Sequence, residues 1–148
     1  MAAPTVTVYP VTGSDPSPVK GAGITQIDFG SVVAGNDSSC SCIVYTPSGN
    51  SISTAALWNQ SDFVDANIDP YHLAQLAYQN PAGFAIASGF TTLPISAITG
   101  TSIDEGGTGN DTIADGNDSE YVYFIIRVGA GAADGADQCT ARLSYNYP

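Results

Sequence analysis

The chain has 148 residues, and its 14 acidic residues outnumber Lys20, Arg127 and Arg142 to give a formal net charge of −11. Nucleic-acid binding needs clustered basic residues that displace counterions from phosphate, and anionic membrane surfaces attract the same kind of cluster. Three scattered basic residues therefore exclude both kinds of partner. The sequence holds no apolar run of 18 residues, so we expect no membrane-spanning helix.

The N-terminal segment reads as an extension of a folded domain. Residues 5–9 (TVTVY) predict a short strand, and the Pro-, Gly- and Ser-rich residues 10–23 predict an extended arm or linker. We therefore divide the chain into an arm, residues 1–23, and one domain, residues 24–148. The first residues lack the basic and apolar regions of a signal peptide, so we expect a chain that is used without export.

Short apolar runs bounded by Gly, Pro, Asn and Ser predict strands through most of the domain. With the terminal segment they make seven or eight strands, a number that suits a β-sandwich. The strands expected ahead of the terminal segment cover residues 24–30, 40–45, 51–58, 83–93 and 94–103.

Residues 69–79 (DPYHLAQLAYQ) form the one predicted helix. Asp69 suits the N-cap and Pro70 the first helical position, while Pro81 follows the expected end. We interpret this segment as a short helix that crosses between the two sheets. Its apolar stripe consists of Leu73, Leu76 and Ala77.

The terminal segment, residues 120–147, contains two runs of strong β-formers joined by a glycine- and alanine-rich stretch. In the second run apolar and polar residues alternate, which predicts a strand with one buried face. We expect the two runs to pair as a hairpin, with their tyrosines forming a cross-strand cluster in the core, or else an exposed surface for association or for stacking on carbohydrate. Those tyrosines are Tyr121, Tyr123, Tyr145 and Tyr147. The predicted class is antiparallel all-β.

The acidic segment 104–119 contains GGTGNDTIA, residues 106–114, which fits the calcium-binding nonapeptide G-G-x-G-x-D-x-U-x at every position. Calcium prefers several oxygen ligands, and glycines let backbone carbonyls turn toward an ion. The following nine residues do not continue the repeat that normally completes such a site. A solvated acidic loop is therefore the competing interpretation. The candidate calcium ligands are Asp104, Asp111, Asp115 and Asp118.

Candidate groups for catalysis are few, and we expect no enzyme activity. The single histidine, His72, lies in the predicted helix. The sequence contains no Gly-x-Ser-x-Gly nucleophile elbow that could supply a serine for it to activate. Apart from the calcium candidates, we expect no cofactor. The three cysteines, Cys40, Cys42 and Cys139, are expected to be free buried thiols, because an unpaired cysteine behaves as a small apolar side chain.

The IDFGSVVAG stretch carries the pattern hydrophobic-x-Phe-Gly-x-Val-x-x-Gly on Ile27, Phe29, Gly30, Val32 and Gly35. With the C-terminal SEYVYFIIRV and CTARLSYNY, this pattern resembles immunoglobulin-like β-sandwich modules of bacteriophage virions. These modules serve as capsid decoration proteins or as head and tail appendages.

The resemblance implies a non-enzymatic structural protein located in the virion. Such a protein would bind the major capsid protein or neighbouring virion subunits and form homo-oligomers. Residues 1–23 would then reach a neighbouring subunit by adding a strand.

Two alternatives stay open. Sequons at Asn36, Asn59, Asn110 and Asn117 favour a strand-exchanging subunit of a cell-surface filament. The acidic segment, together with aromatic residues such as Trp58, would instead suit a calcium-dependent carbohydrate-binding module.

Overall fold

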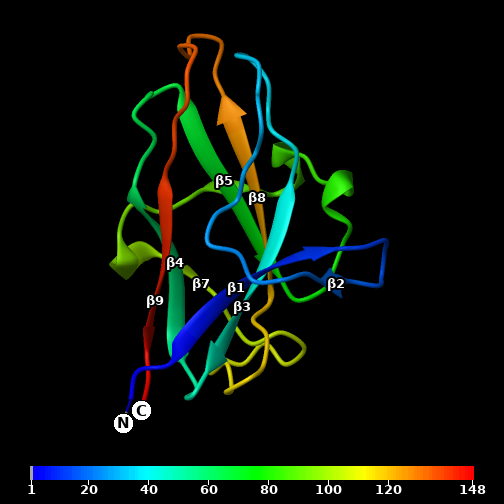
Figure 1. Ribbon diagram of the computed structural model, residues 1–148, viewed down its shortest axis with the longest axis vertical. Coiled ribbons are helices and arrows are strands. Elements are labelled where there is room, and N and C mark those ends of the chain that lie inside the picture. The colour runs from blue at the N-terminus through cyan, green and yellow to red at the C-terminus, as the bar shows by residue number, and fades with distance from the viewer. Residues whose placement is uncertain (1) are drawn as a thin grey trace.

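Nine strands in the described chain, residues 2–148 of the computed structural model, form two antiparallel sheets that face each other (Figure 1). The larger sheet has six strands in the order β2-β1-β3-β8-β5-β6, and the smaller has three in the order β7-β4-β9. This arrangement confirms the predicted all-β antiparallel sandwich. The strands are β1 (Thr5–Thr12), β2 (Val19–Lys20), β3 (Ser41–Ser48), β4 (Ser53–Ser61), β5 (Ile68–Gln75), β6 (Thr91–Thr92), β7 (Thr101–Ser102), β8 (Tyr121–Val128) and β9 (Thr140–Asn146).

The central strands β3 and β8 are buried on both faces, with runs of six and five consecutive buried residues. Such runs are typical of strands that are covered from both sides. One face packs against the smaller sheet in an inner cluster, and the opposite face forms an outer cluster. The inner cluster contains Ile43, Tyr45, Ile52, Ala55, Leu57, Leu93, Ile103, Ile113, Val122 and Phe124. The outer cluster contains Val11, Cys42, Val44, Ile86, Phe90, Tyr123 and Ile125.

The outer cluster is covered by the chain between β5 and β6, which includes the short 3-10 helices η1 (Pro81–Gly83) and η2 (Ile86–Ser88). The Phe84 ring lies 4.6 Å from the Tyr123 ring and 5.6 Å from the Phe90 ring, measured between centroids. The Tyr123 hydroxyl donates to the Gln79 carbonyl oxygen at 3.0 Å. Most of the predicted strand 83–93 therefore forms this cover, and only Thr91 and Thr92 pair in the sheet.

The predicted C-terminal hairpin is wrong, because its two strands lie in different sheets. Strand β8 pairs with β3 and β5 in the larger sheet, whereas β9 pairs with β4 in the smaller one. The physical reason is that β8 is apolar on both faces and takes neighbours along both edges, which leaves no edge for β9. Leu143 and Tyr145 of β9 pack on the inner cluster from the opposite side.

The predicted helix over residues 69–79 is also wrong, because residues 68–75 form strand β5. This strand pairs with β8 through eight successive residues. Its alternate residues face different clusters: Ala74 packs on the inner cluster, while Tyr71 and Leu73 pack on the outer one. The period of two thus places apolar side chains of this segment on both clusters, and Leu76 of the predicted helical stripe is left exposed.

Most of the predicted N-terminal arm folds onto the domain. Strand β1 pairs with β3 through six successive residues, and Val11 is buried in the outer cluster. The chain then turns back, so that β2 pairs with the end of β1 and Ile24 bridges to Val8. In this chain residues 5–12 are therefore a strand of the larger sheet, next to one of its central strands.

Two further predicted strands are mostly irregular. In residues 24–30 only Ile24 makes a bridge, although Ile27 and Phe29 still pack on the inner cluster. Residues 94–103 hold the 3-10 helix η3 (Ala97–Thr99) and the two-residue strand β7. Both segments contribute apolar side chains, Ile27, Phe29 and Ile103, to the inner cluster with only a few ladder hydrogen bonds to β1 and β4.

His72 joins the two sheets. Its Nδ1 lies 2.9 Å from the Thr91 carbonyl oxygen, and its Nε2 lies 2.6 Å from the Thr101 hydroxyl in the smaller sheet. A carbonyl oxygen can only accept, so Nδ1 donates and Nε2 accepts from the hydroxyl. Burial lowers the pKa of His72, which favours this neutral form, although the Thr91 contact acts in the opposite direction.

We expect Leu57→Ala to lower the free energy of unfolding by about 2–5 kcal/mol, because Leu57 has 0% exposed surface and its loss leaves a cavity. Urea denaturation followed by circular dichroism measures this change. Ile98→Ala, at a side chain that is 96% exposed, is the matched control and should change the free energy by no more than about 0.5 kcal/mol. Equal changes in the free energy of unfolding for both variants would contradict the packing of Leu57 in the inner cluster.

His72 should make folding stability depend on pH. Because the folded-state pKa is lowered, stability is complete above the unfolded value of 6.5 and is lost as the pH falls below it. The unfolding free energy of His72→Gln should lack this part of the pH dependence. Denaturant titrations of both proteins between neutral and mildly acidic pH measure the difference, and parallel curves would contradict the prediction.

Candidate functional site

The acidic loop, residues 104–119, is anchored to the sandwich at both ends and in its middle. Glu105 bridges to Ser119 near the loop ends, and Ile113 bridges to Ile52. Ile113 has 0% exposed surface within the inner cluster. A loop with a core side chain at its centre is held against the domain rather than extended into solvent.

Glu105 organises the loop from inside. One carboxylate oxygen accepts from the Thr108 hydroxyl at 2.9 Å. The other accepts from the Ala114 N–H at 2.9 Å and from the Asn117 amide at 3.0 Å. The Ala114 N–H, followed by the Asn117 and Thr108 side chains, lowers the pKa of Glu105 by stabilising the carboxylate. The ionised side chain therefore holds together residues that are up to 12 positions apart.

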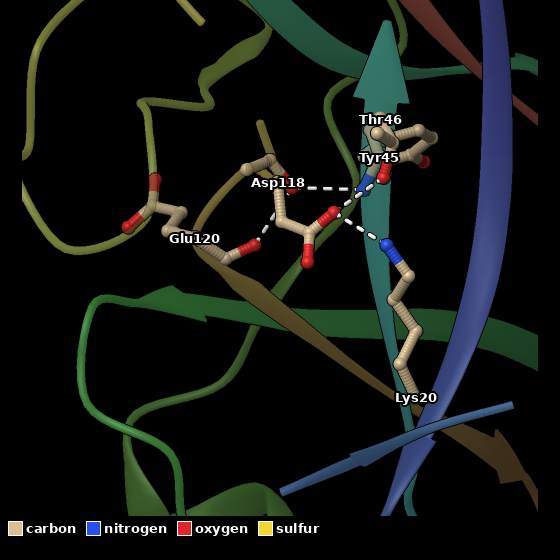
Figure 2. A network of polar contacts seen from close by, with 6 residues as sticks. Lys20, Tyr45, Thr46, Asp118 and Glu120 are labelled. Carbon is tan, nitrogen blue, oxygen red and sulfur yellow. Dashed lines mark hydrogen bonds and ion pairs between the residues drawn. The ribbon is translucent and has the colours of Figure 1, made fainter. Parts of the chain in front are cut away.

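Asp118 ties the loop to the N-terminal strands, as Figure 2 shows. Its Oδ1 accepts from the Lys20 ammonium at 2.8 Å and from the Thr46 hydroxyl at 2.6 Å. Beside it, the buried Ser119 hydroxyl accepts from the Tyr45 N–H at 2.9 Å and donates to the Glu120 carbonyl oxygen at 2.8 Å (Figure 2). These bonds fix the loop exit against β2 and β3.

Glu120 has an environment opposite to that of Glu105. Burial raises its pKa, the nearby Asp104 carboxylate adds to the increase, and the Asp104 N–H bonded to Oε1 partly offsets both. The loop and the residue that follows it thus carry one carboxylate whose charge is stabilised by its donors, Glu105, and one whose charge is disfavoured, Glu120.

The four predicted calcium ligands have separate partners. Asp111 accepts from the Thr54 N–H at 3.1 Å, and Asp115 accepts from the Gly49 N–H at 3.0 Å. Asp104 accepts from the Ser102 hydroxyl at 3.3 Å, while Asp118 holds Lys20 and Thr46. Within residues 2–148 no three His, Cys, Asp or Glu side chains gather closely enough to hold a metal ion. The arrangement of these four side chains does not support a shared calcium site. Calcium binding by them therefore stays a prediction from the sequence alone.

The sequence pattern pointed to the aspartates and missed the role of Glu105. The sequence feature that could have revealed this role is the glycine pattern directly after Glu105. In the structure Gly107 and Gly109 adopt φ of 83° and 71°. These left-handed conformations suit glycine and turn the loop back toward the Glu105 carboxylate. The nonapeptide pattern therefore matches a self-contained carboxylate-centred turn.

The remaining candidate residues have structural surroundings. Cys40, Cys42 and Cys139 are free, and burial raises the pKa of Cys40 and of Cys42 to about 12. Of the sequon residues, Asn59 is buried at 4% exposure, whereas the other three are exposed. Among residues 2–148, no helix is long and apolar enough to cross a membrane.

The second candidate site is the free edge of β9. This strand is the last of the smaller sheet and pairs only with β4 (Figure 1). Its seven residues contain no proline and one charged side chain, Arg142. The other sheet edges, β2, β6 and β7, are each two residues long. In the described chain β9 is therefore the one strand longer than two residues that has no neighbouring strand along one whole edge.

The pairing with β4 shows which backbone groups of β9 point outward. The Asn59 N–H donates to the Pro94 carbonyl oxygen, away from β9, so Asn59 and its partner Ala141 form a non-hydrogen-bonded pair. The pattern alternates along an antiparallel ladder. Ala141, Leu143 and Tyr145 therefore direct their N–H and C=O groups toward the open edge.

No protein-family model, no curated protein and no solved structure matches the chain.

We expect Glu105→Gln and Glu120→Gln to affect stability in opposite ways. Glu105 has a lowered pKa, so its contribution is present above the unfolded value of 4.5 and is lost as the pH falls. Glu105→Gln should therefore destabilise the protein at neutral pH and less so in acid. Glu120 has a raised pKa, so its ionisation opposes folding as the pH rises past 4.5.

Glu120→Gln keeps an acceptor for the Asp104 N–H and should melt at or above the wild-type temperature at neutral pH. Thermal melts of the three proteins across the acidic range test both signs. A neutral-pH loss of stability in Glu120→Gln that matches the loss in Glu105→Gln would contradict the contrast between the two sites.

Proposed function

We propose that this protein is a non-enzymatic structural subunit of a virion, a capsid decoration or appendage protein that associates with neighbouring copies by strand addition at β9. The partners are a second copy of the chain and the capsid surface, in line with the resemblance of the IDFGSVVAG and C-terminal segments to phage decoration modules. The observation that carries the proposal is the open, proline-free edge of β9.

The edge of β9 is regular enough to accept a strand. Register shifts occur in its pairing with β4, between Ser53 and Ala56 and between Asn59 and Ser61. In each case β4 advances one residue more than β9, so the extra residues lie on β4. β9 itself keeps a continuous repeat, and natural sheets usually protect such edges with prolines, bulges or several charges.

A symmetric antiparallel contact between two β9 strands satisfies the outward groups on both copies. Centred on Leu143, it places Arg142 opposite Ser144 of the second copy and Thr140 opposite Asn146. The two arginines then avoid direct opposition, which would weaken the pair. Such a contact is self-complementary and closes as a dimer.

The charge of the chain sets the salt dependence of this contact. Two copies of net charge −11 repel each other over long distances, and salt screens that repulsion. Lys20 and Arg127 each form an ion pair with an aspartate, at 2.8 and 3.0 Å. Among the described residues Arg142 makes no ion pair, and it places a positive charge at the edge of β9. Association of two copies should therefore strengthen as salt is added.

The same edge serves the alternative function, a subunit of a cell-surface filament. The two functions differ in the symmetry of the contact, because a β9–β9 contact closes whereas a head-to-tail contact continues into a fibre. Exposed Asn36 and Asn110 would accept glycans in such an exported subunit, and buried Asn59 would not. Intact mass of the natively purified chain separates the two readings.

We expect Ala141→Pro to abolish self-association while leaving the fold intact. The substitution removes an N–H that points to the open edge, and proline is tolerated where the N–H faces solvent. Light scattering of wild type up to roughly 1 mM, the weak end of specific association, should show a dimer, and the variant should stay monomeric.

Arg142→Pro is the matched control, because the alternation directs the Arg142 N–H at its partner Trp58 in β4. This variant should lower the melting temperature clearly more than Ala141→Pro does. A wild-type protein that stays monomeric in high salt, or an Ala141→Pro protein that still dimerises, would overturn association through β9.

A further inference from the structure

A groove of about 540 Å³ lies between the turn that joins β1 to β2 and the acidic loop. Volumes of about 300–1,000 Å³ are usual for small-molecule sites. None of the residues that line the groove belongs to β9, and β2, which carries Lys20, lies at the opposite side of the view from β9 in Figure 1. The groove is therefore separate from the proposed association edge. Its lining residues that carry the argument are Pro16, Lys20, Tyr78, Asn117, Asp118 and Tyr121.

Two tyrosines give one wall of the groove a stiff aromatic surface. The rings of Tyr78 and Tyr121 pack edge to face, with centroids 5.2 Å apart and planes at 65°. The Tyr78 hydroxyl donates to the Gly13 carbonyl oxygen at 2.9 Å, which fixes the ring against the β1–β2 turn. Pro16 lines the groove from that turn.

The polar groups of the groove are held in place by the acidic loop. Asn117 donates its amide N–H to Glu105, so the oriented side chain keeps its oxygen as an acceptor. Asp118 is positioned by Lys20 and Thr46, and one of its oxygens, Oδ1, receives both donors. The second oxygen, Oδ2, is the acceptor that remains for a ligand hydroxyl.

We propose that this groove binds an uncharged saccharide of one to three sugar units. Sugar rings present apolar C–H faces and many hydroxyls, which match the tyrosine wall and the oriented Asn117 and Asp118 oxygens. A net charge of −11 disfavours an anionic ligand, and the Lys20–Asp118 ion pair already satisfies the charged groups of the groove. The neutral ligand needs no calcium, because Asp118 is oriented by protein donors.

The test is a titration of the ¹⁵N-labelled full chain followed by amide chemical shifts, in the presence of EDTA. The probes are the neutral trisaccharides maltotriose, cellotriose, N,N′,N″-triacetylchitotriose and mannotriose, with a proline-rich peptide as the competing class. At least one trisaccharide should shift the amides of Asn117, Asp118 and Tyr121 saturably at millimolar concentration.

Tyr121→Ala should weaken that binding roughly tenfold, in line with the loss of one aromatic contact. Tyr121→Leu keeps apolar packing and serves if the alanine variant does not fold. Asp118→Asn should also weaken binding, while Tyr147→Ala, at an exposed tyrosine outside the groove, should bind as wild type does.

Shifts confined to residues outside the groove, no saturable shift with any trisaccharide, or binding of the peptide alone would overturn the proposal. Binding that Tyr121→Leu and Asp118→Asn leave unchanged would overturn it as well. The Ala141→Pro monomer should bind the trisaccharide normally, so a failure of self-association and a failure of saccharide binding are distinguishable.

Discussion

The two central strands of the larger sheet, β3 and β8, are apolar on both faces, and this constraint determines most of the architecture. Each face of the sheet needs its own cover, because either one would otherwise expose a contiguous apolar surface to water. The smaller sheet covers the inner cluster, and the chain between β5 and β6 covers the outer cluster. The chain therefore builds two cores around one sheet.

The double cover leaves the two sheets unequal, with six strands facing three. Residues 83–90 and 94–100 are used as cover and connection, so little regular strand remains to extend the smaller sheet. β4 obtains one long neighbour, β9, and one two-residue neighbour, β7. The open edge of β9 is thus a direct consequence of the need to bury the outer face of β3 and β8.

The sequence pattern was sufficient to predict the fold class and the position of several strands. It was insufficient to predict which strands pair with one another, or that residues 68–75 form the strand β5. Alternation in residues 139–147 and the apolar run of 120–128 mark both as strands, but alternation does not say which strand lies alongside. In β5, Asp69, Pro70 and a helical stripe of apolar residues fit a helix locally. Only packing against the inner cluster on one face and the outer cluster on the other favours the extended form. The fixed carboxylate of Glu105 was equally hidden, because its donors come from positions 3 to 12 residues along the loop.

The interior carboxylate also explains how a glycine-rich acidic loop can form one wall of a defined groove. A loop with four glycines between residues 106 and 116 loses much conformational entropy when it becomes ordered. Three donors on Glu105, the Ile113 side chain in the inner cluster and the Asp118–Lys20 pair offset that loss at separate points along the loop. The loop is thus ordered before any ligand binds. Binding in the groove would not have to offset the conformational entropy lost when the loop becomes ordered. The same reasoning separates the groove from β9: one site is formed by bonds already made within the chain, and the other by backbone groups that the chain leaves unpaired.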